Sequence, residues 1–492
     1  MNRRRDLPVF PLSRTPVRSS ISNHAEIVYH EFDDVGEEDG PRIALVTLGC
    51  DKNTVDSERT MAALLGHGAR VSSDVQDAEV IIVNTCGFIR SAKEQSIETI
   101  LDACAMKGEG GVRAVVAVGC LVQRHGDELA KEIPEVDLFL GLTELPKLVT
   151  ELRGLGFLPD KSTPVPLMER PLRLLSSELR HTSYLKVSEG CDHTCAFCAI
   201  PMMRGLHRSQ PINHLVREAS GLHAAGVQEI NIVSQDTTWY GRDLRRHDSE
   251  APLLPDLLRA LLEGTAIPWY RLFYMYPSGI TRELVDLLAS ESRILPYLDM
   301  PIQHGSDRIL TLMRRPERRE TIIERAGWLR EAIPGLTLRT TVIVGFPGES
   351  EDDFSQMLEL LEEIQFERVG AFTYSVEEGT RAERLPDHVP RDVMDDRLEE
   401  LMELQRAISF ERNSMYVGRE TDVLVDQSLN DDPEYGAVGR TDGQAVDVDG
   451  VTHLIGSGVW KPGEFVRARV VGAHDYDLVA EIVETTHQLT SS

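Results

Sequence analysis

The chain has 492 residues, enough for about three domains, and its 41% hydrophobic and 27% charged residues are typical of a folded globular protein. No uninterrupted apolar stretch approaches the roughly 18 residues of a transmembrane helix, so no membrane association is expected. The net charge of −28 excludes attraction to nucleic acid over the whole surface and suits a basic protein partner. Seven cysteines without a recognisable export signal predict reduced thiols in the cytoplasm, used for metal binding or catalysis.

The N-terminal third predicts a parallel-sheet α/β domain at residues 41–154, preceded by a disordered extension at residues 1–40. Three buried-strand patterns here each end in a cysteine: IALVTLGC in Cys50, EVIIVNTC in Cys86 and AVVAVGC in Cys120. Helical patterns separate these runs, and such alternation predicts parallel strands. Because parallel strands present their carboxyl ends at one sheet edge, we expect the three cysteines to meet there.

A further cysteine of this region, Cys104, lies in a helix expected from Ser91 to Ala105. The spacing of Ile97, Ile100, Leu101 and Cys104 predicts one buried helical face. A lone cysteine usually behaves as a small buried hydrophobe, so no chemical role is assigned to Cys104.

Beyond a proline-interrupted linker at 155–180, residues 181–413 again alternate between strand and helix patterns. The strand candidates are SYLKVSEG, EINIVSQD, YRLFYMYP, YLDMPIQ, LRTTVIVGF and VGAFTYS. Six such units predict a partial (βα)6 barrel with its chemistry at the carboxyl ends of the strands. Residues 414–485 carry the short strand candidates TDVLVDQ, YGAVGRT, QAVDVDG, EFVRARVVGA and YDLVAEIV, which predict a small antiparallel β-barrel.

Three cysteines, Cys191, Cys195 and Cys198, follow the first barrel strand at C-x3-C-x2-C spacing. A structural zinc site needs four protein ligands, so His193 or His207 would have to complete one. A [4Fe–4S] cluster is usually held by four thiolates, and three would leave one iron open to a small molecule. The spacing alone leaves both kinds of site open.

The C-x3-C-x2-C motif after the first strand of a βα barrel resembles the radical SAM superfamily. This resemblance implies that the open iron binds S-adenosylmethionine (SAM) and that an electron from the cluster cleaves it to a 5′-deoxyadenosyl radical. Other strand ends match the family's SAM contacts more loosely, at Gln235, Gln303 and Gly345. A glycine there permits close approach of a ligand, although ordinary strand-to-helix turns are the alternative.

The cysteines that end the N-terminal strands carry a second resemblance, to the methylthiotransferases of the radical SAM superfamily. It covers the chain from about Arg42 to its end and implies that Cys50, Cys86 and Cys120 hold a second [4Fe–4S] cluster. It also implies that the small β-barrel is a TRAM-like domain. The segments LGCDKNTVDSE, NTCGFIRSAKEQSIETIL, YLDMPIQHGSDRIL and YSVEEGTRA resemble the RimO type, which modifies a ribosomal protein. The MiaB type, which modifies tRNA, typically has Arg-Pro where this chain has Glu377-Glu378.

Two segments depart from the usual RimO pattern. Asp51 stands where proline is common, and AVDVDG at 445–450 replaces a more typical APEVDG. Neither is expected to change the chemistry, although the second could alter the surface that docks the substrate.

The charge of the C-terminal domain bears on the choice between protein and tRNA. Residues 414–485 hold 5 basic and 14 acidic residues, a net charge of −9. A domain that grips tRNA should be basic and offer aromatic faces, so direct RNA binding is not expected. An acidic surface suits a basic ribosomal protein, and a merely solvated acidic face is the alternative.

Together these resemblances imply an enzyme that inserts a methylthio group at the β-carbon of an aspartate in ribosomal small-subunit protein twelve. One SAM would supply the radical and another the methyl group, and a low-potential donor such as flavodoxin or ferredoxin would supply electrons. We expect a monomer. The alternatives are a tRNA adenosine methylthiotransferase and a zinc-stabilised, non-catalytic ribosome-binding protein.

Overall fold

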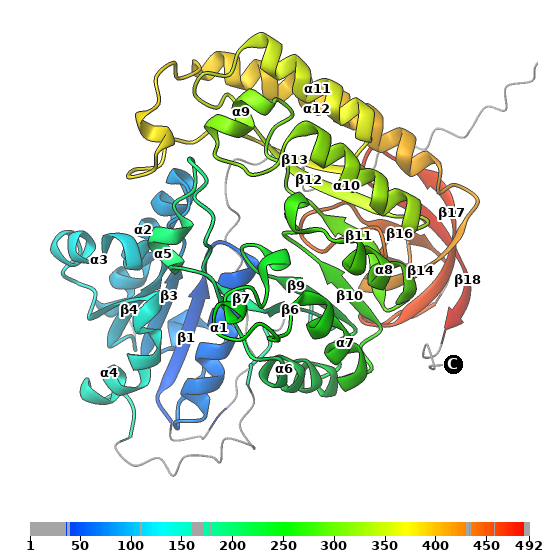
Figure 1. Ribbon diagram of the computed structural model, residues 1–492. Coiled ribbons are helices and arrows are strands. Elements are labelled where there is room, and N and C mark those ends of the chain that lie inside the picture. The colour runs from blue at the N-terminus through cyan, green and yellow to red at the C-terminus, as the bar shows by residue number, and fades with distance from the viewer. Residues whose placement is uncertain are drawn as a thin grey trace, which may run out of the picture.

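The structure, a computed structural model, describes residues 40–108, 111–159, 172–176, 179–429, 434–456 and 458–486, together with residues 36 and 432. The extension expected at 1–40 lies outside the described residues apart from positions 36 and 40, and so does more than half of the linker expected at 155–180. Two parallel sheets and a small closed barrel follow one another along the chain, which confirms the predicted α/β fold class (Figure 1).

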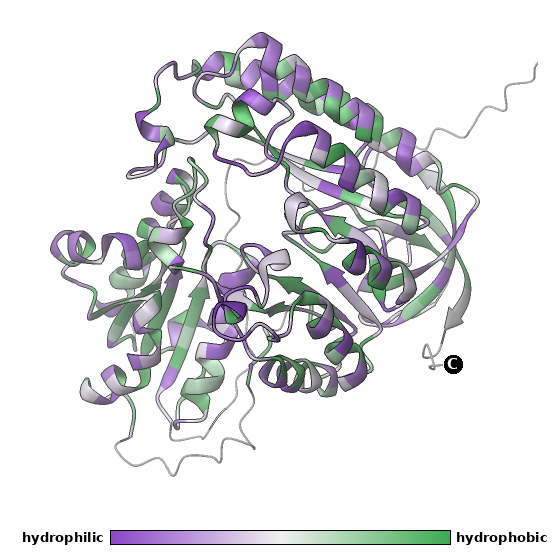
Figure 2. Cartoon of the chain, in the orientation of Figure 1, coloured by the Kyte–Doolittle hydropathy of each residue, from purple (hydrophilic) through white to green (hydrophobic). Residues whose placement is uncertain are grey.

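The N-terminal sheet has five parallel strands in the order β2-β1-β3-β4-β5. They are β1 (Arg42–Thr47), β2 (Arg70–Val71), β3 (Val80–Thr85), β4 (Ala114–Gly119) and β5 (Leu138–Gly141), and the helices are α1 (Asp51–Leu65), α2 (Arg90–Ala105), α3 (Cys120–Glu132) and α4 (Leu148–Gly154). The strands β3 and β4 are buried at every position, because apolar side chains pack on both faces of the sheet. Figure 2 shows these strands as predominantly hydrophobic.

The buried face of α2 differs from the predicted one at Leu101. Ile100 is fully buried, and Ile97 and Cys104 pack partly buried against the same core, but Leu101 is 50% exposed. Successive residues of a helix point about 100° apart, so Leu101 turns away when Ile100 faces the sheet. The prediction that Leu101 belongs to the buried face is therefore wrong.

The central sheet has six parallel strands in the order β13-β12-β11-β10-β9-β6, as expected of a partial (βα)6 barrel. They are β6 (Thr182–Lys186), β9 (Glu229–Val233), β10 (Trp269–Leu272), β11 (Ile294–Asp299), β12 (Thr337–Val344) and β13 (Arg368–Thr373). The helices are α6 (Ile212–Ala224), α7 (Leu254–Gly264), α8 (Arg282–Ser290), α10 (Arg319–Ala332), α11 (Glu351–Ile364) and α12 (Arg391–Ser414), with the shorter α5 (Ile200–Arg204) and α9 (Asp307–Leu312) near the strand ends. Two short strands, β7 (Ser188–Glu189) and β8 (Arg208–Ser209), pair beside the cysteine loop. No helix in the described part of the chain is long and apolar enough to cross a membrane.

The C-terminal strands close a barrel in the order β14-β15-β16-β18-β17. They are β14 (Glu420–Ser428), β15 (Ala437–Thr441), β16 (Thr452–Ile455), β17 (Phe465–Ala473) and β18 (Leu478–Thr486). Most neighbours are antiparallel, as predicted, but β16 and β18 run parallel. The strand expected at QAVDVDG is wrong, because this segment is a loop in which Asp447 has φ +66° and the strand follows it at Thr452.

The loop at 444–450 instead packs against the central sheet. The hydroxyl of Tyr184 donates to Asp447 (3.2 Å) and that of Tyr297 donates to Asp449 (2.8 Å). The small barrel therefore sits on the face of the central sheet that the helices leave uncovered, on the side away from the N-terminal domain (Figure 1). Within this loop Asp447 and Val448 remain exposed, so an effect of the segment on substrate docking stays a prediction.

Candidate functional site: two groups of cysteines

The structure brings Cys50, Cys86 and Cys120 to the carboxyl edge of the N-terminal sheet. Cys50 caps α1 after β1, Cys86 follows β3, and Cys120 begins α3 directly after β4. Burial, reinforced by the nearby Cys50 thiol, raises the pKa of Cys86 to about 12. Burial also raises the pKa of Cys120 to about 11, against the charge of Arg204. The three thiols are therefore neighbours, and two of them are buried.

Glycines beside these cysteines permit the close approach. Gly49 has φ +101°, and a Cβ placed on it would lie 2.8 Å from Cys86 Cβ. A Cβ on Gly87 would lie 2.8 Å from the Cα of Leu121, next to Cys120. Distances under 3 Å leave no room for a side chain, so these glycines are required for packing. Gly119, before Cys120, is confined in the same way, since it has φ +103° and a Cβ on it would lie 2.5 Å from Asn84 Oδ1. The glycine beside each of the three cysteines thus has a steric cause.

The second group, Cys191, Cys195 and Cys198, occupies the loop between β7 and α5. The backbone amide of Cys191 donates to Gly205 O (3.0 Å), and that of Cys198 donates to Cys195 O (3.2 Å). Burial, with the charge of Cys195 as a further cause, raises the pKa of Cys191 and of Cys198 to about 12. Three neighbouring thiols in a compact loop match the donor set of an iron–sulfur site.

Buried arginines provide positive charge beside both groups. Arg315 lies with Nη1 3.9 Å from Cys195 Sγ and stacks 3.9 Å from the ring centre of Tyr276. Arg204 lies near Cys120 and Cys50, and donates to Asn53 Oδ1 (2.6 Å). Thiolates that hold a cluster are negatively charged, so these guanidinium groups fit a cluster at each site.

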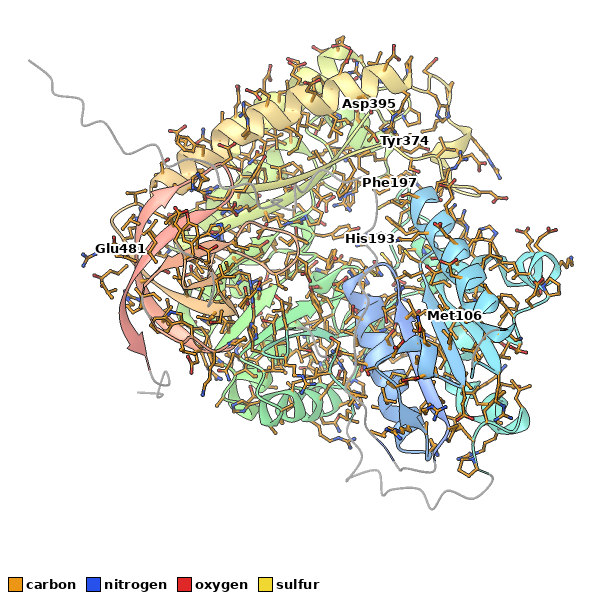
Figure 3. The ribbon with its side chains drawn as sticks, turned by 180° about the vertical axis from the view of Figure 1, so that it is seen from behind. Met106, His193, Phe197, Tyr374, Asp395 and Glu481 are labelled. Atoms are coloured by element: carbon orange, nitrogen blue, oxygen red, sulfur yellow. The ribbon has the colours of Figure 1, made fainter. Side chains whose placement is uncertain are left out.

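A short helix joins the two groups in space. Cys120 packs in one apolar cluster with Ala199, the residue after Cys198, and with Met203 of α5. The two groups of cysteines therefore lie on the two sides of this apolar contact between the N-terminal domain and the central barrel. Figure 3 shows His193 and Phe197 of the second loop near the place where the N-terminal domain meets the barrel.

The histidines considered as zinc ligands bond elsewhere. His193 Nε2 lies 2.7 Å from Asp236 Oδ2, and its ring stacks on Tyr276. His207 Nε2 lies 3.2 Å from Ser209 Oγ. Within the described residues, no three His, Cys, Asp or Glu side chains converge on a position for one metal ion. A four-iron cluster spreads its ligands over several irons, so three thiolates can fit a cluster without converging on one point.

Comparisons with known proteins agree with this arrangement. Residues 42–141 match the uncharacterised protein family UPF0004, residues 185–361 match the radical SAM superfamily, and residues 417–483 match the TRAM domain. The chain is 44% identical over 442 residues to the ribosomal protein uS12 methylthiotransferase RimO of Myxococcus xanthus (strain DK1622), covering 89% of this chain and 91% of the relative. The proteins of the same name from Desulforudis audaxviator (strain MP104C) and Geobacter sulfurreducens (strain ATCC 51573 / DSM 12127 / PCA) are 45% and 41% identical, and each match covers 90% of this chain and 97% or 98% of the relative.

The chain belongs to the RimO family of radical SAM methylthiotransferases. Membership of the superfamily implies a [4Fe–4S] cluster and SAM. Among solved structures, the cobalamin-dependent S-adenosylmethionine radical enzyme OxsB is a distant likeness, with a TM-score of 0.49, 13% identity, and coverage of 74% of this chain and 56% of that one.

In this member of the RimO family, the three residues expected to contact SAM lie beyond the ends of the barrel strands. Within the described residues, the side chains of Gln235 and Gln303 form no hydrogen bond, so their amides are available to a ligand. Gly345 differs, because its amide donates to Glu349 (2.9 Å) and a Cβ on it would lie 2.3 Å from Met394 Cγ. Packing therefore explains this glycine without a ligand.

Sequence reasoning missed a polar network that crosses the inner face of the barrel. Lys52 Nζ lies 3.2 Å from the ring centre of Tyr274, whose hydroxyl donates to Asp51 (3.3 Å). The amide of Tyr274 donates to Asp299 (3.0 Å), which also accepts from Arg339 (2.8 Å). Asp51, which departs from the usual RimO pattern, also pairs with its neighbour Lys52 (3.2 Å), but Tyr274 and Asp299 are distant in sequence and leave no local signal.

Proposed function

We propose that this chain methylthiolates the β-carbon of an aspartate in ribosomal protein uS12, using two [4Fe–4S] clusters and SAM. The observation that carries the proposal is the identity of 41–45%, over about 90% of the chain, to proteins named ribosomal protein uS12 methylthiotransferase RimO. A carbon without an acidic proton yields its hydrogen to a cofactor-derived radical rather than to an acid–base side chain.

In this proposal each group of cysteines holds one cluster: Cys191, Cys195 and Cys198 in the barrel, and Cys50, Cys86 and Cys120 in the N-terminal domain. When bound, the barrel cluster supplies the electron that cleaves SAM and the N-terminal cluster carries the sulfur that is inserted. Arg315 and Arg204 offset the negative charge of the thiolates. Gln235 and Gln303 contact SAM through their side-chain amides.

The inner face of the barrel suits an acidic target residue. Lys52 is 4% exposed and its ammonium faces Tyr274, while Arg339 lies beside Asp299 on the same face. Both cations are already paired, Lys52 with Asp51 (3.2 Å) and Arg339 with Asp299 (2.8 Å), so an incoming carboxylate would share these cations with the carboxylates of the chain. An aspartate side chain of the substrate would be oriented here by hydrogen bonds from Lys52 and Arg339 rather than by unpaired charge.

The acidic C-terminal barrel is proposed to hold the basic ribosomal protein. Some of its carboxylates are already used internally, since Asp426 pairs with Arg440 and His181, and Asp449 contacts Tyr297. The outward-facing acidic side chains remain for the substrate, and their attraction should weaken with salt. On this proposal the protein acts in the cytoplasm as a monomer, does not bind RNA directly, and receives electrons from a low-potential donor protein.

The proposal is tested by comparing Cys86→Ala with Cys104→Ala in the purified, reconstituted enzyme. With uS12 as substrate, Cys86→Ala should still cleave SAM but should form no methylthio product. Cys104→Ala should behave as the parent, because Cys104 lies away from both groups of cysteines. Methylthiolation of uS12 by Cys86→Ala would refute the two-cluster assignment, and methylthiolation of a tRNA adenosine instead of uS12 would refute the substrate.

A further inference from the structure

A pocket of about 300 Å³ lies against the loop that carries the barrel cysteines. Its lining comes from three places in the chain: the cysteine loop, the end of α9 and the segment after β13. The eight lining residues include Ala196, Gly379, Arg314, Arg381 and Arg384. Three of the eight are arginines and none is acidic, and Glu383 beside the lining is bonded to the amide of Gly379 (2.8 Å), so the lining itself is cationic.

The three arginines have no partner in the part of the chain that the structure describes. Arg314, Arg381 and Arg384 are exposed, and none of their side chains forms an ion pair or a hydrogen bond with another described residue. Buried Arg397, by contrast, is paired with Glu349 (2.8 Å). In a chain of net charge −28, a pocket of unpaired cations creates a local positive field on a negative surface.

The floor of this arginine pocket is one residue away from Cys195. The amide of Ala196 donates to Met313 O (2.9 Å), and the amide of Ala382 donates to Ala196 O (2.8 Å). These bonds tie the cysteine loop to both segments that carry the arginines. Arg314 also directly precedes Arg315, whose Nη1 lies 3.9 Å from Cys195 Sγ.

The arginine pocket is backed by closely packed side chains. Ala196, Met313 and Ala382 belong to one buried apolar cluster, which also includes Tyr374 at the end of β13 and against which Phe197 packs. Figure 3 shows Phe197 and Tyr374 near each other. A partner seated on the arginines would therefore be held at a fixed, short distance from the cysteine loop.

We propose that the arginine pocket docks an acidic, low-potential electron-transfer protein of the ferredoxin class. The inference rests on the proposed function, which requires a donor. In the step that it serves, the reduced donor loses one electron and becomes oxidised, and the cluster held by Cys191, Cys195 and Cys198 gains that electron. Redox partners use small, weak interfaces, so a few arginines suffice to define the docking position.

Charge explains why such a donor needs this pocket. An acidic donor is repelled by a surface of net charge −28, and unpaired cations would direct it to one place. RNA phosphates are also anionic, but the position of the arginines against the cysteine loop favours a redox partner. The pocket thus specifies where the electron enters.

The test uses the full-length reconstituted protein and replaces the arginines singly and together with Arg314→Asn, Arg381→Gln and Arg384→Gln. Asparagine is chosen at 314 because that residue has φ +58°, a conformation that asparagine tolerates. The control is Arg217→Gln, which removes an exposed arginine from α6. Binding of an oxidised acidic ferredoxin is measured at low and at high salt, and the rate of cluster reduction is measured with reduced ferredoxin and with dithionite.

We expect the triple variant to bind ferredoxin more weakly by about tenfold or more at low salt, with the difference lost at high salt, and the control to match the parent. Reduction of the triple variant by ferredoxin should slow to the same extent. Unchanged ferredoxin binding would overturn the proposal, and so would an equal slowing with dithionite. Unchanged ferredoxin binding with weaker binding of a ribosomal RNA fragment would assign the arginines to RNA. Binding of oxidised donor involves neither SAM nor uS12, so its failure is distinct from failure of the proposed function.

Discussion

Replacing Gly49 with alanine should disturb the N-terminal cysteine group selectively. Its φ of +101° costs an L-residue about 1–2 kcal/mol. The added Cβ would lie 2.8 Å from Cys86 Cβ and 2.9 Å from Cys86 Sγ, and overpacking of this kind costs about 1–3 kcal/mol. The free energy of unfolding of the N-terminal domain should therefore fall by about 2–5 kcal/mol.

The assay combines hydrogen exchange with iron analysis. Peptides from β1 and β3 should exchange faster in Gly49→Ala, and the reconstituted protein should lose about four of its roughly eight iron atoms. Gly154→Ala is the matched control, because this glycine ends α4 with no atom within 4 Å of an added Cβ. Helical alanine is favoured over glycine, so the control should be neutral or more stable. Full iron content and unchanged exchange in Gly49→Ala would refute the steric account of the cysteine group.

Two further predictions concern buried charges. Arg315→Gln removes a cation 3.9 Å from Cys195 Sγ, so the reduction potential of the barrel cluster, followed by EPR, should fall by about 60–130 mV. Arg315→Lys keeps the charge and should restore part of the potential. An unchanged potential in Arg315→Gln would refute this role of Arg315. Glu229→Gln leaves Arg271 and Arg440 buried without their shared carboxylate and should loosen the contact between the barrel and the C-terminal domain by about 3–5 kcal/mol, measured by hydrogen exchange of β14 and β15. Burial alone would raise the pKa of Glu229, but the two arginines lower it overall. In the parent, the contact between the barrel and the C-terminal domain should therefore persist above about pH 4.5 and weaken as the pH falls further. A contact whose strength does not depend on pH would contradict this prediction.

Three strands of the N-terminal sheet and the six strands of the central sheet could be predicted from their apolar and β-branched runs, but β2 and β5 were missed because they are only two and four residues long. The meeting of Cys50, Cys86 and Cys120 also followed from sequence, since parallel topology alone places strand ends at one edge. The loop at 444–450 was mistaken for a strand because its alternating valines and aspartates imitate a half-buried strand. Its true partners, Tyr184 and Tyr297, lie more than a hundred residues away.

The charged side chains around the cysteines could not be predicted. Arg204 and Arg315 look like ordinary surface residues in the sequence, and only the tertiary fold buries them beside thiols. The arginine pocket has the same origin, since Arg314 and Arg381 come from segments that meet only through backbone bonds to the cysteine loop. Local patterns thus locate the cysteines, but the charges around them depend on contacts distant in sequence.

The central claim is methylthiolation of uS12, and the most direct measurement is the mass of uS12 from cells with and without this gene. Replacing hydrogen by a methylthio group adds about 46 Da, and we predict that one aspartate of uS12 carries this mass only when the gene is present. Expression of the Cys86→Ala variant in the deletion strain should not restore it, whereas Cys104→Ala should. An unchanged uS12 mass in the deletion strain would contradict the account.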